Sequence, residues 1–233
     1  MIKPYYEEPG IVIYHADCRE ILPLLDERAD LFIADPPFSI PVKYHDAAGN
    51  FPRSWGDLAV MEPFFREVFA AMRTAQKDDA QTYICCDHQS YPIFFKAALP
   101  FWQRSHLIIW YKPTGRRGNG WKHSHELIMH LATPWTSYGD KFLQDVIGIM
   151  PTRTLNREHP AEKPGDLWLF LLQASPAINR LVIDPFMGSG ESLLVTRNAG
   201  HRAIGIEIEE KYCEIAVRRL QQEVLPLKSD SEK

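Results

Sequence analysis

The residues with the clearest chemical character are Asp35-Pro36-Pro37-Phe38, which follow the apolar run Leu31-Phe32-Ile33-Ala34. Such a run is typical of a buried strand. Proline fixes φ and has no backbone N–H, so the carbonyl groups of this turn remain acceptors beside the Asp35 carboxylate. Two acceptors next to the flat face of Phe38 suit a planar ring that carries an amino group. A plain Pro-terminated turn is the simpler interpretation, and the rest of the chain decides between them.

A second set of chemical residues is Asp184-Pro185-Phe186-Met187-Gly188-Ser189-Gly190, after the apolar run at 181–183. Its glycines let a ligand approach the backbone closely, and the helix that follows favours an anionic group at its start. Glu207 ends the next expected strand, where an acid commonly accepts hydrogen bonds from ribose hydroxyls. The full dinucleotide motif is absent, because Leu193 stands at the third glycine position. Since Asp184 disfavours a pyrophosphate, the pattern predicts a nucleoside-bearing ligand with a cationic amino group.

The composition is that of an ordinary globular domain. The chain has 233 residues, 45% apolar and 24% charged, with a formal net charge of −4. This charge argues against a generally basic nucleic-acid coat but permits a local basic patch. None of the four cysteines lies in a C-x-x-C pattern, so we expect reduced thiols and no zinc site. No signal peptide or membrane-spanning run is visible, and we expect a cytoplasmic protein, of bacterial or phage origin by the family likeness given below.

Strands and helices alternate along nearly the whole chain, which predicts an α/β fold around a mostly parallel sheet. Strands are expected at 11–14, 30–34, 81–86, 106–111, 126–131, 181–183 and 203–208. Helices are expected at 17–25, 61–73, 91–99, 166–172, around 193–196 and at 211–224, with loops at 39–58 and 112–125. Ligands of such folds bind at the carboxyl ends of the strands, where this chain carries four acids: Asp17, Asp35, Asp184 and Glu207.

The two motifs together resemble those of the DNA amino-methyltransferases, in the β group where the catalytic motif precedes the cofactor motif. Two further stretches support the resemblance. Tyr14-His15-Ala16-Asp17-Cys18 is similar to the Gly-Asp-Cys segment that meets the cofactor's adenine. His159-Pro160-Ala161-Glu162-Lys163-Pro164 is similar to the segment that leads into the helix before the cofactor strand. The four stretches span residues 10–220 in the family's order.

The resemblance implies a Rossmann-like S-adenosylmethionine-dependent methyltransferase fold, with seven mostly parallel strands of which one is reversed. It implies a single domain over 1–225, with a catalytic half at about 11–131 and a cofactor half at 159–225. The irregular segment 132–158 would carry DNA contacts, and we expect a disordered tail at 226–233.

Residue roles follow from the same resemblance. The catalytic residues would be Asp35, Pro36, Pro37 and Phe38, with no metal: the acid and the first proline carbonyl accept the amino hydrogens, and the aromatic ring stacks on a flipped base. The cofactor would meet Asp184 through its amino group, Glu207 through its ribose, and Asp17 and Cys18 through its adenine. The complete cofactor set is Asp17, Cys18, Asp35, His159, Lys163, Asp184, Phe186, Gly188, Ser189, Gly190, Glu191, Ser192 and Glu207.

The chain departs from the family pattern at three places. Ala16 replaces a glycine, and Phe38 replaces the commoner tyrosine. Glu191-Ser192 stands where the family often has two threonines. Glu191 would bring a second carboxylate towards the cofactor's own, which either weakens binding or requires the side chain to turn outward.

Basic residues in the loop after residue 111 are candidates for DNA phosphate contact, with a simply solvated loop as the alternative. They are Lys112, Arg116, Arg117, Lys122 and His123. DNA is the partner that the resemblance implies, and family analogy adds a homodimer and a cognate restriction endonuclease.

The function favoured by these residues is adenine-N6 methylation of DNA, because Asp-Pro-Pro-aromatic is typical of adenine enzymes and Ser-Pro-Pro-Tyr of cytosine-N4 enzymes. Cytosine-N4 methylation is the first alternative. A non-catalytic DNA- or nucleotide-binding protein derived from such an enzyme is an alternative of another class, which the intact Asp35, Gly188 and Gly190 disfavour.

Overall fold

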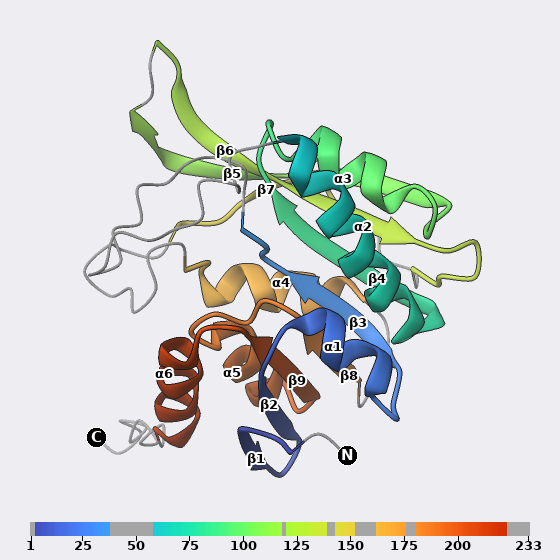
Figure 1. Ribbon diagram of the computed structural model, residues 1–233. Coiled ribbons are helices and arrows are strands. Elements are labelled where there is room, and N and C mark those ends of the chain that lie inside the picture. Colours follow the sequence, from blue (N-terminus) through green and yellow to red (C-terminus); the bar gives the residue numbers. More distant parts are fainter. Residues whose placement is uncertain are drawn as a thin grey trace, which may run out of the picture.

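A mixed β-sheet runs through the middle of the molecule, with helices on both of its faces (Figure 1). The computed structural model describes residues 3–37, 58–117, 120–138, 143–151, 162–175 and 180–222. Within these ranges the strand order is β1-β2-β9-β8-β3-β4-β6-β5-β7. The strands are β1 (Tyr6–Glu8), β2 (Ile11–His15), β3 (Ala29–Ala34), β4 (Gln76–Cys86), β5 (Arg104–Arg117), β6 (Lys122–Ala132), β7 (Val146–Gly148), β8 (Leu181–Asp184) and β9 (Arg202–Glu207).

The seven strands from β2 to β5 in this order form the predicted sheet. β6 is antiparallel to both of its neighbours, and the other six run parallel to one another. The expectation of seven strands with one reversed is therefore confirmed. The described residues add two edge strands, β1 antiparallel to β2 and β7 parallel to β5. Each is three residues long, too short to show an alternating pattern in the sequence.

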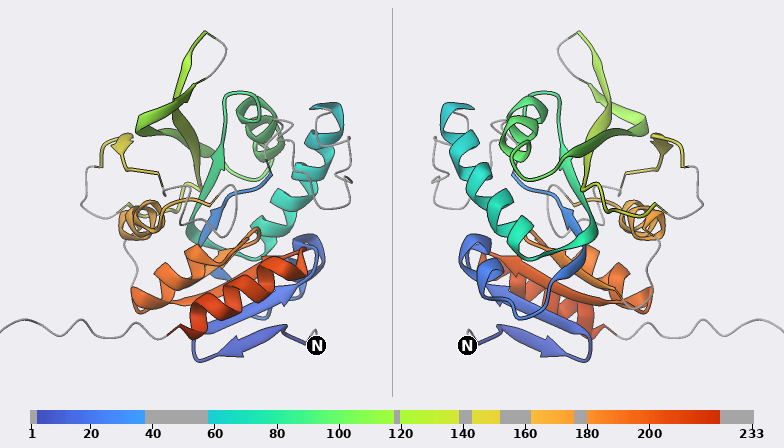
Figure 2. Two further views of the ribbon diagram at one scale, coloured as in Figure 1. Left: turned by 90° about the vertical axis from the view of Figure 1, so that its left-hand side faces the viewer. Right: turned by 90° about the vertical axis from the view of Figure 1, so that its right-hand side faces the viewer.

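Helices cover both faces of the sheet, as Figure 2 shows in side view, and the short 3-10 helix η1 lies with those on the first face. The first face carries α1 (Cys18–Ile21), η1 (Leu22–Leu24), α2 (Leu58–Thr74) and α3 (Tyr91–Ala98). The second carries α4 (Gly165–Ala174), α5 (Glu191–Asn198) and α6 (Glu210–Gln221). The single helix expected at 17–25 is divided, because Pro23 cannot donate the next helical hydrogen bond. No helix in the described ranges is long and apolar enough to cross a membrane.

The core follows the two-residue period of the strands. On β3, Phe32 packs with Phe65 of α2 on the first face, while Leu31 and Ile33 pack with Leu171 of α4 on the second. All five side chains are fully buried, and burying such a side chain contributes roughly 1.5–3 kcal/mol. β3 is thereby packed on both of its faces, which fixes the position of its carboxyl end.

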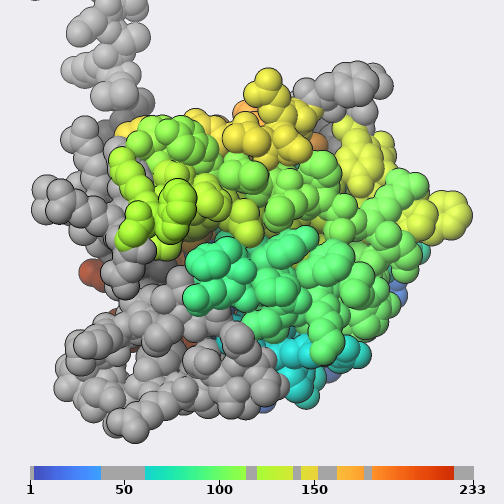
Figure 3. Space-filling model, turned by 90° about the horizontal axis from the view of Figure 1, so that it is seen from above, coloured from blue at the N-terminus to red at the C-terminus, as the bar shows by residue number. Residues whose placement is uncertain are grey.

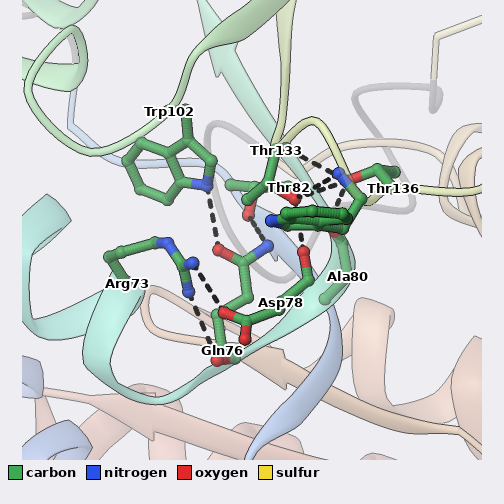
Figure 4. A network of polar contacts seen from close by, with 9 residues as sticks. Arg73, Gln76, Asp78, Ala80, Thr82, Trp102, Thr133 and Thr136 are labelled. Carbon is green, nitrogen blue, oxygen red and sulfur yellow. Dashed lines mark hydrogen bonds and ion pairs between the residues drawn. The ribbon is translucent and has the colours of Figure 1, made fainter.

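A buried polar network fixes the opposite, amino end of β4 (Figure 4). The indole N–H of Trp102 donates to Gln76 Oε1 at 2.9 Å, and Gln76 Nε2 donates to Thr82 Oγ1 at 3.0 Å. Thr136, in the turn after β6, donates to the Ala80 carbonyl at 3.1 Å. Because these partners come from distant parts of the chain, β4 begins five residues before the expected start at 81.

β5 and β6 form a long hairpin that projects beyond the rest of the sheet (Figure 1). The loop expected at 112–125 is wrong in its described part, since Arg116 pairs with His123 and Arg117 with Lys122 across the two strands. A register shift between Tyr111 and Arg116 accommodates the proline and glycine that suggested a loop. Figure 3 looks down on this end of the molecule and shows residues of the hairpin at its surface.

Candidate active site

Four neighbouring strands carry the four predicted acids at their carboxyl ends, so the acids lie together at one end of the sheet. The order β2-β9-β8-β3 places Asp17, Glu207, Asp184 and Asp35 one after another, each at the carboxyl end of its strand. Local pairing fixes this alignment, with His15 opposite Glu207 and Asp184 opposite Gly205. The sequence indicated the four strand ends, and the sheet shows that they are adjacent.

Asp184 is a buried carboxyl group with hydrogen-bond donors but no cationic partner among the described residues. Asp184 is only 3% exposed to solvent. Oδ1 accepts from the Phe186 backbone N–H at 3.0 Å, and Oδ2 accepts from the Ser192 hydroxyl. Burial raises the pKa of Asp184 to about 7, although the two hydrogen bonds act in the opposite direction. A ligand that brings a positive charge to this carboxyl group would relieve the cost of ionising it.

The glycine turn after β8 holds its backbone against the neighbouring strand and helix. The Gly188 N–H donates to Glu207 Oε2 at 3.0 Å, and the Glu209 N–H donates to Oε1 at 2.9 Å. Gly190 has φ +78°, and a Cβ there would lie 2.6 Å from that of Ala216 in α6. Each oxygen of Glu207 keeps a further lone pair, so this carboxylate can accept bonds from ligand hydroxyls.

Asp17 is the N-cap of α1, as the sequence predicts. Its Oδ1 accepts from the Arg19 backbone N–H at 2.9 Å, and the Arg19 guanidinium binds both carboxylate oxygens. Arg19 thereby holds the pKa of Asp17 below its usual range. Cys18 is buried, which raises the pKa of its thiol to about 12. The two residues shape the helix start, and their contact with adenine stays a prediction.

Glu191 turns towards α6, which answers the question raised by its place in the glycine turn. Its Oε2 accepts from Arg219 at 2.7 Å. Arg219 also donates to Glu162 at 3.1 Å, and the Ser189 hydroxyl donates to the same carboxylate at 3.0 Å. Glu162 and Arg219 were not predicted as site residues, because their partners are remote in sequence. Their contacts join the segment before α4 to the cofactor turn.

The Asp35 carboxylate lies against an ammonium group that comes from the segment before α4. Lys163 Nζ donates to Oδ1 at 2.8 Å and to Oδ2 at 2.7 Å. The same Nζ lies 3.3 Å from Glu126 Oε2 on β6, and Glu126 also pairs with Lys112 on β5. Burial raises the pKa of Asp35, while Lys163 acts to lower it. The two carboxylates raise the pKa of Lys163, so this lysine is a cation in the folded protein.

Two of the predicted residues have partners that the sequence did not indicate. Lys112 was expected to contact DNA phosphate, but its ammonium binds Glu126 and its side chain is 15% exposed. Lys163 was predicted as one of the cofactor residues, and its ammonium donates to Asp35. Glu126 was not predicted as a site residue at all. Ion pairs between residues 128 apart in the chain, as in Lys163 and Asp35, leave no local pattern in a sequence.

The remaining predicted residues lie in several different environments. Pro36 is buried and Pro37 exposed. Lys122 and His123 are exposed at the start of β6, beside Trp121, which is 85% exposed. Phe38, His159 and the loop 39–58, apart from its last residue in α2, lie outside the described residues, as does the tail 226–233. Across the described ranges, no group of three or more His, Cys, Asp or Glu side chains could hold a metal ion.

Solved structures first define the class of this fold. The PvuII DNA methyltransferase, titled cytosine-N4-specific, aligns with a TM-score of 0.74 at 15% identity, covering 96% of this chain and 90% of the other. A complex of M1.HpyAVI with SAM aligns with a TM-score of 0.68 at 22% identity, covering 91% of this chain and 100% of the other. The fold is therefore the Rossmann-like fold of S-adenosylmethionine-dependent DNA methyltransferases.

Sequence comparisons show which proteins this chain is similar to. The DNA methylase family model of the N6/N4 type matches residues 136–218. The type II methyltransferase M2.DpnII of Streptococcus pneumoniae is 25% identical over 96% of this chain and 94% of its own length. M.ScaI of Streptomyces caespitosus is 23% identical over 97% of this chain and 86% of its own. These matches support the N6/N4 DNA methyltransferase family for this chain, and the M1.HpyAVI relative is solved in complex with SAM.

Proposed function

We propose that this protein transfers a methyl group from S-adenosylmethionine to the N6 amine of adenine in DNA. One observation carries the proposal: Asp35 and Asp184 lie at the carboxyl ends of two adjacent parallel strands, β3 and β8. The first acid belongs to a turn with spare acceptors, and the second to a turn suited to a cationic ligand. Their adjacency supports a reaction between an amino-bearing base and that ligand.

The cofactor residues fit S-adenosylmethionine by their chemistry. Asp184, which is buried without a cationic partner among the described residues, would bind the amino group of the methionine moiety. The backbone from Gly188 to Gly190 would lie against the ligand, since neither glycine carries a side chain to block it. Glu207 would accept bonds from the ribose hydroxyls. When bound, S-adenosylmethionine supplies an activated methyl group on a positively charged sulfur atom.

Asp35 and the Pro36 carbonyl would prepare the nucleophile. The exocyclic amine of adenine is a poor nucleophile, because its lone pair is delocalised into the ring. The two acceptors would each take one amino hydrogen and draw the nitrogen towards tetrahedral geometry, which directs the lone pair out of the ring plane. Prior deprotonation is unnecessary, so the rate would come chiefly from positioning and from stabilising the positive charge that develops on nitrogen.

Access to the amine requires the base to leave the duplex. Phe38 would stack on the extruded base, next to the acceptors of the same turn. Arg116, Arg117, Lys122 and His123, on the projecting hairpin, would contact phosphate. A homodimer and a cognate restriction endonuclease are further proposals that rest on the family alone.

The choice of adenine rests on Asp35, since serine is more usual at this position in cytosine-N4 enzymes. The likeness to the PvuII enzyme shows the fold alone at 15% identity and does not decide the base. Purified protein incubated with deuterated-methyl S-adenosylmethionine and unmethylated genomic DNA tests the proposal by mass spectrometry of the nucleosides. Labelled N6-methyladenine is expected. Labelled N4-methylcytosine would refute the base assignment, and no labelled nucleoside, with no calorimetric binding of the cofactor, would favour a non-catalytic protein.

A further inference from the structure

Four charged side chains, all largely shielded from solvent, form a continuous row beside the catalytic turn. In spatial order they are Asp35, Lys163, Glu126 and Lys112. They come from the end of β3, the segment before α4, β6 and β5, so the row crosses the sheet above β4. The exposed fractions of their side chains lie between 5% and 22%, and the charges alternate to a sum of zero. In so enclosed a place each charge depends on its neighbours.

Lys163 is shared between two carboxylates at unequal distances. Its Nζ lies 2.7 and 2.8 Å from the two oxygens of Asp35 and 3.3 Å from the nearer oxygen of Glu126. An ammonium group has three donors, and a carboxylate has about four acceptor sites. Lys163 therefore takes one site on each oxygen of Asp35, and a target amine must compete with it or use the sites that remain. A second carboxylate attracts Lys163 away from the first.

We propose that Glu126 is a positioning residue for methyl transfer: by sharing Lys163 with Asp35, it limits how firmly the ammonium holds the carboxylate that accepts the target amine. Lys112 balances Glu126, so that Glu126 does not withdraw Lys163 altogether. The inference rests on the proposed function, because it assigns these residues a part in the same site. It also links the base of the β5–β6 hairpin, where Lys112 and Glu126 lie, to the catalytic acid.

Replacing Glu126 and replacing Lys112 should shift the titration of Asp35 in opposite directions. Glu126 raises the pKa of Asp35 and Lys112 lowers it. Glu126→Gln should therefore move the Asp35 titration to lower pH, and Lys112→Gln should move it to higher pH. The other titratable groups that interact with Asp35 are Cys85 and Cys86 on β4, whose burial keeps them neutral thiols, and Asp184 at the end of β8. All three are the same in all the variants.

The test follows Asp35 directly by carbon-13 NMR of protein labelled at the aspartate carboxyl carbons, with Asp35→Asn to assign the signal. The same proteins are assayed for methyl transfer to unmethylated genomic DNA across pH. For Glu126→Gln we expect a tighter Lys163–Asp35 pair, a fall of about tenfold in kcat, and an acidic limb moved to lower pH. For Lys112→Gln we expect the limb at higher pH. Glu126→Asp keeps the negative charge, so Asp35 should titrate at a higher pH in this variant than in Glu126→Gln, as it does in the wild-type protein.

Glu27→Gln is the matched control, since it removes a carboxylate from an exposed ion pair with Arg202. This pair lies at the amino ends of the parallel strands, away from Asp35. It should leave the NMR titration and the pH profile unchanged. Shifts in one common direction, or no shift in either variant, would overturn the proposal. If Glu126→Gln does not fold, Lys112→Gln alone decides by the presence or absence of its upward shift. Absence of methyl transfer by the wild-type protein would refute the proposed function instead, while the NMR titration would still measure the coupling.

Discussion

Replacing the buried Asp184 carboxyl group with the amide of asparagine should stabilise the free protein at neutral and alkaline pH. Asparagine keeps the shape, and its amide can hydrogen-bond to the Phe186 N–H and to a rotated Ser192 hydroxyl. What it removes is the need to ionise a side chain in a site that is 3% exposed. The substitution therefore separates the electrostatic cost of this residue from its packing.

The magnitude follows from the pKa of Asp184, which burial raises from 3.8 to about 7. Between these values the folded protein holds a proton that the unfolded chain has lost, so the free energy of unfolding falls as pH rises. Each pKa unit corresponds to about 1.4 kcal/mol. From pH 5 to pH 8, two units of this window are crossed, and the wild-type protein should lose about 3 kcal/mol that Asp184→Asn does not lose.

Denaturant unfolding of both proteins without cofactor, at pH 5, 6, 7 and 8, measures this difference. Other titrating groups are common to both proteins and cancel in the comparison. Cofactor affinity should change in the opposite sense, since loss of a charge-assisted hydrogen bond to the amino group weakens binding about 10- to 100-fold by calorimetry. If the difference in free energy of unfolding between the two proteins is the same at all four pH values, the reasoning about burial is refuted. Unchanged cofactor affinity would refute the binding role.

Three further predictions concern separate parts of the site. Asp35→Ala should abolish methyl transfer yet leave calorimetric cofactor binding largely intact; near-wild-type activity would contradict the mechanism. Gly190→Ala should cost about 1–3 kcal/mol in the free energy of unfolding, because φ is +78° and a Cβ would overlap Ala216, and an unchanged unfolding curve would contradict this. Charge reversal at Arg116 and Arg117 should weaken DNA binding and flatten its dependence on salt in a filter-binding titration; an unchanged salt slope would exclude them as phosphate contacts.

The chemistry of the sheet edge was predictable because it is local in sequence. Asp35 and Asp184 each follow an apolar run directly, and the glycines that hold the cofactor turn lie within six residues of Asp184. The same holds for Asp17, whose place before α1 identifies it as a helix cap. Strand ends, caps and glycine turns depend on neighbouring residues, so the sequence alone indicates them.

Contacts between distant segments were not predictable in this way. Lys163 was assigned to the cofactor from its motif, but its partner is Asp35, 128 residues away. Lys112 lies in a basic stretch that suggested DNA contact, and only the pairing of β5 with β6 reveals that it faces Glu126. Strands were expected at 106–111 and 126–131, but their extension into the projecting hairpin was missed, because Pro113 and the glycines of this stretch indicate a loop, whereas the cross-strand pairing with β6 continues beyond them.

The central claim is adenine-N6 methylation that depends on Asp35, and single-molecule sequencing of DNA from a methylation-deficient bacterium expressing the protein tests it most directly. The wild-type protein should place N6-methyladenine at a defined sequence, and Asp35→Ala expressed at the same level should place none. Methylation of cytosine N4, methylation that persists in Asp35→Ala, or unmodified DNA in the presence of folded wild-type protein would contradict the claim.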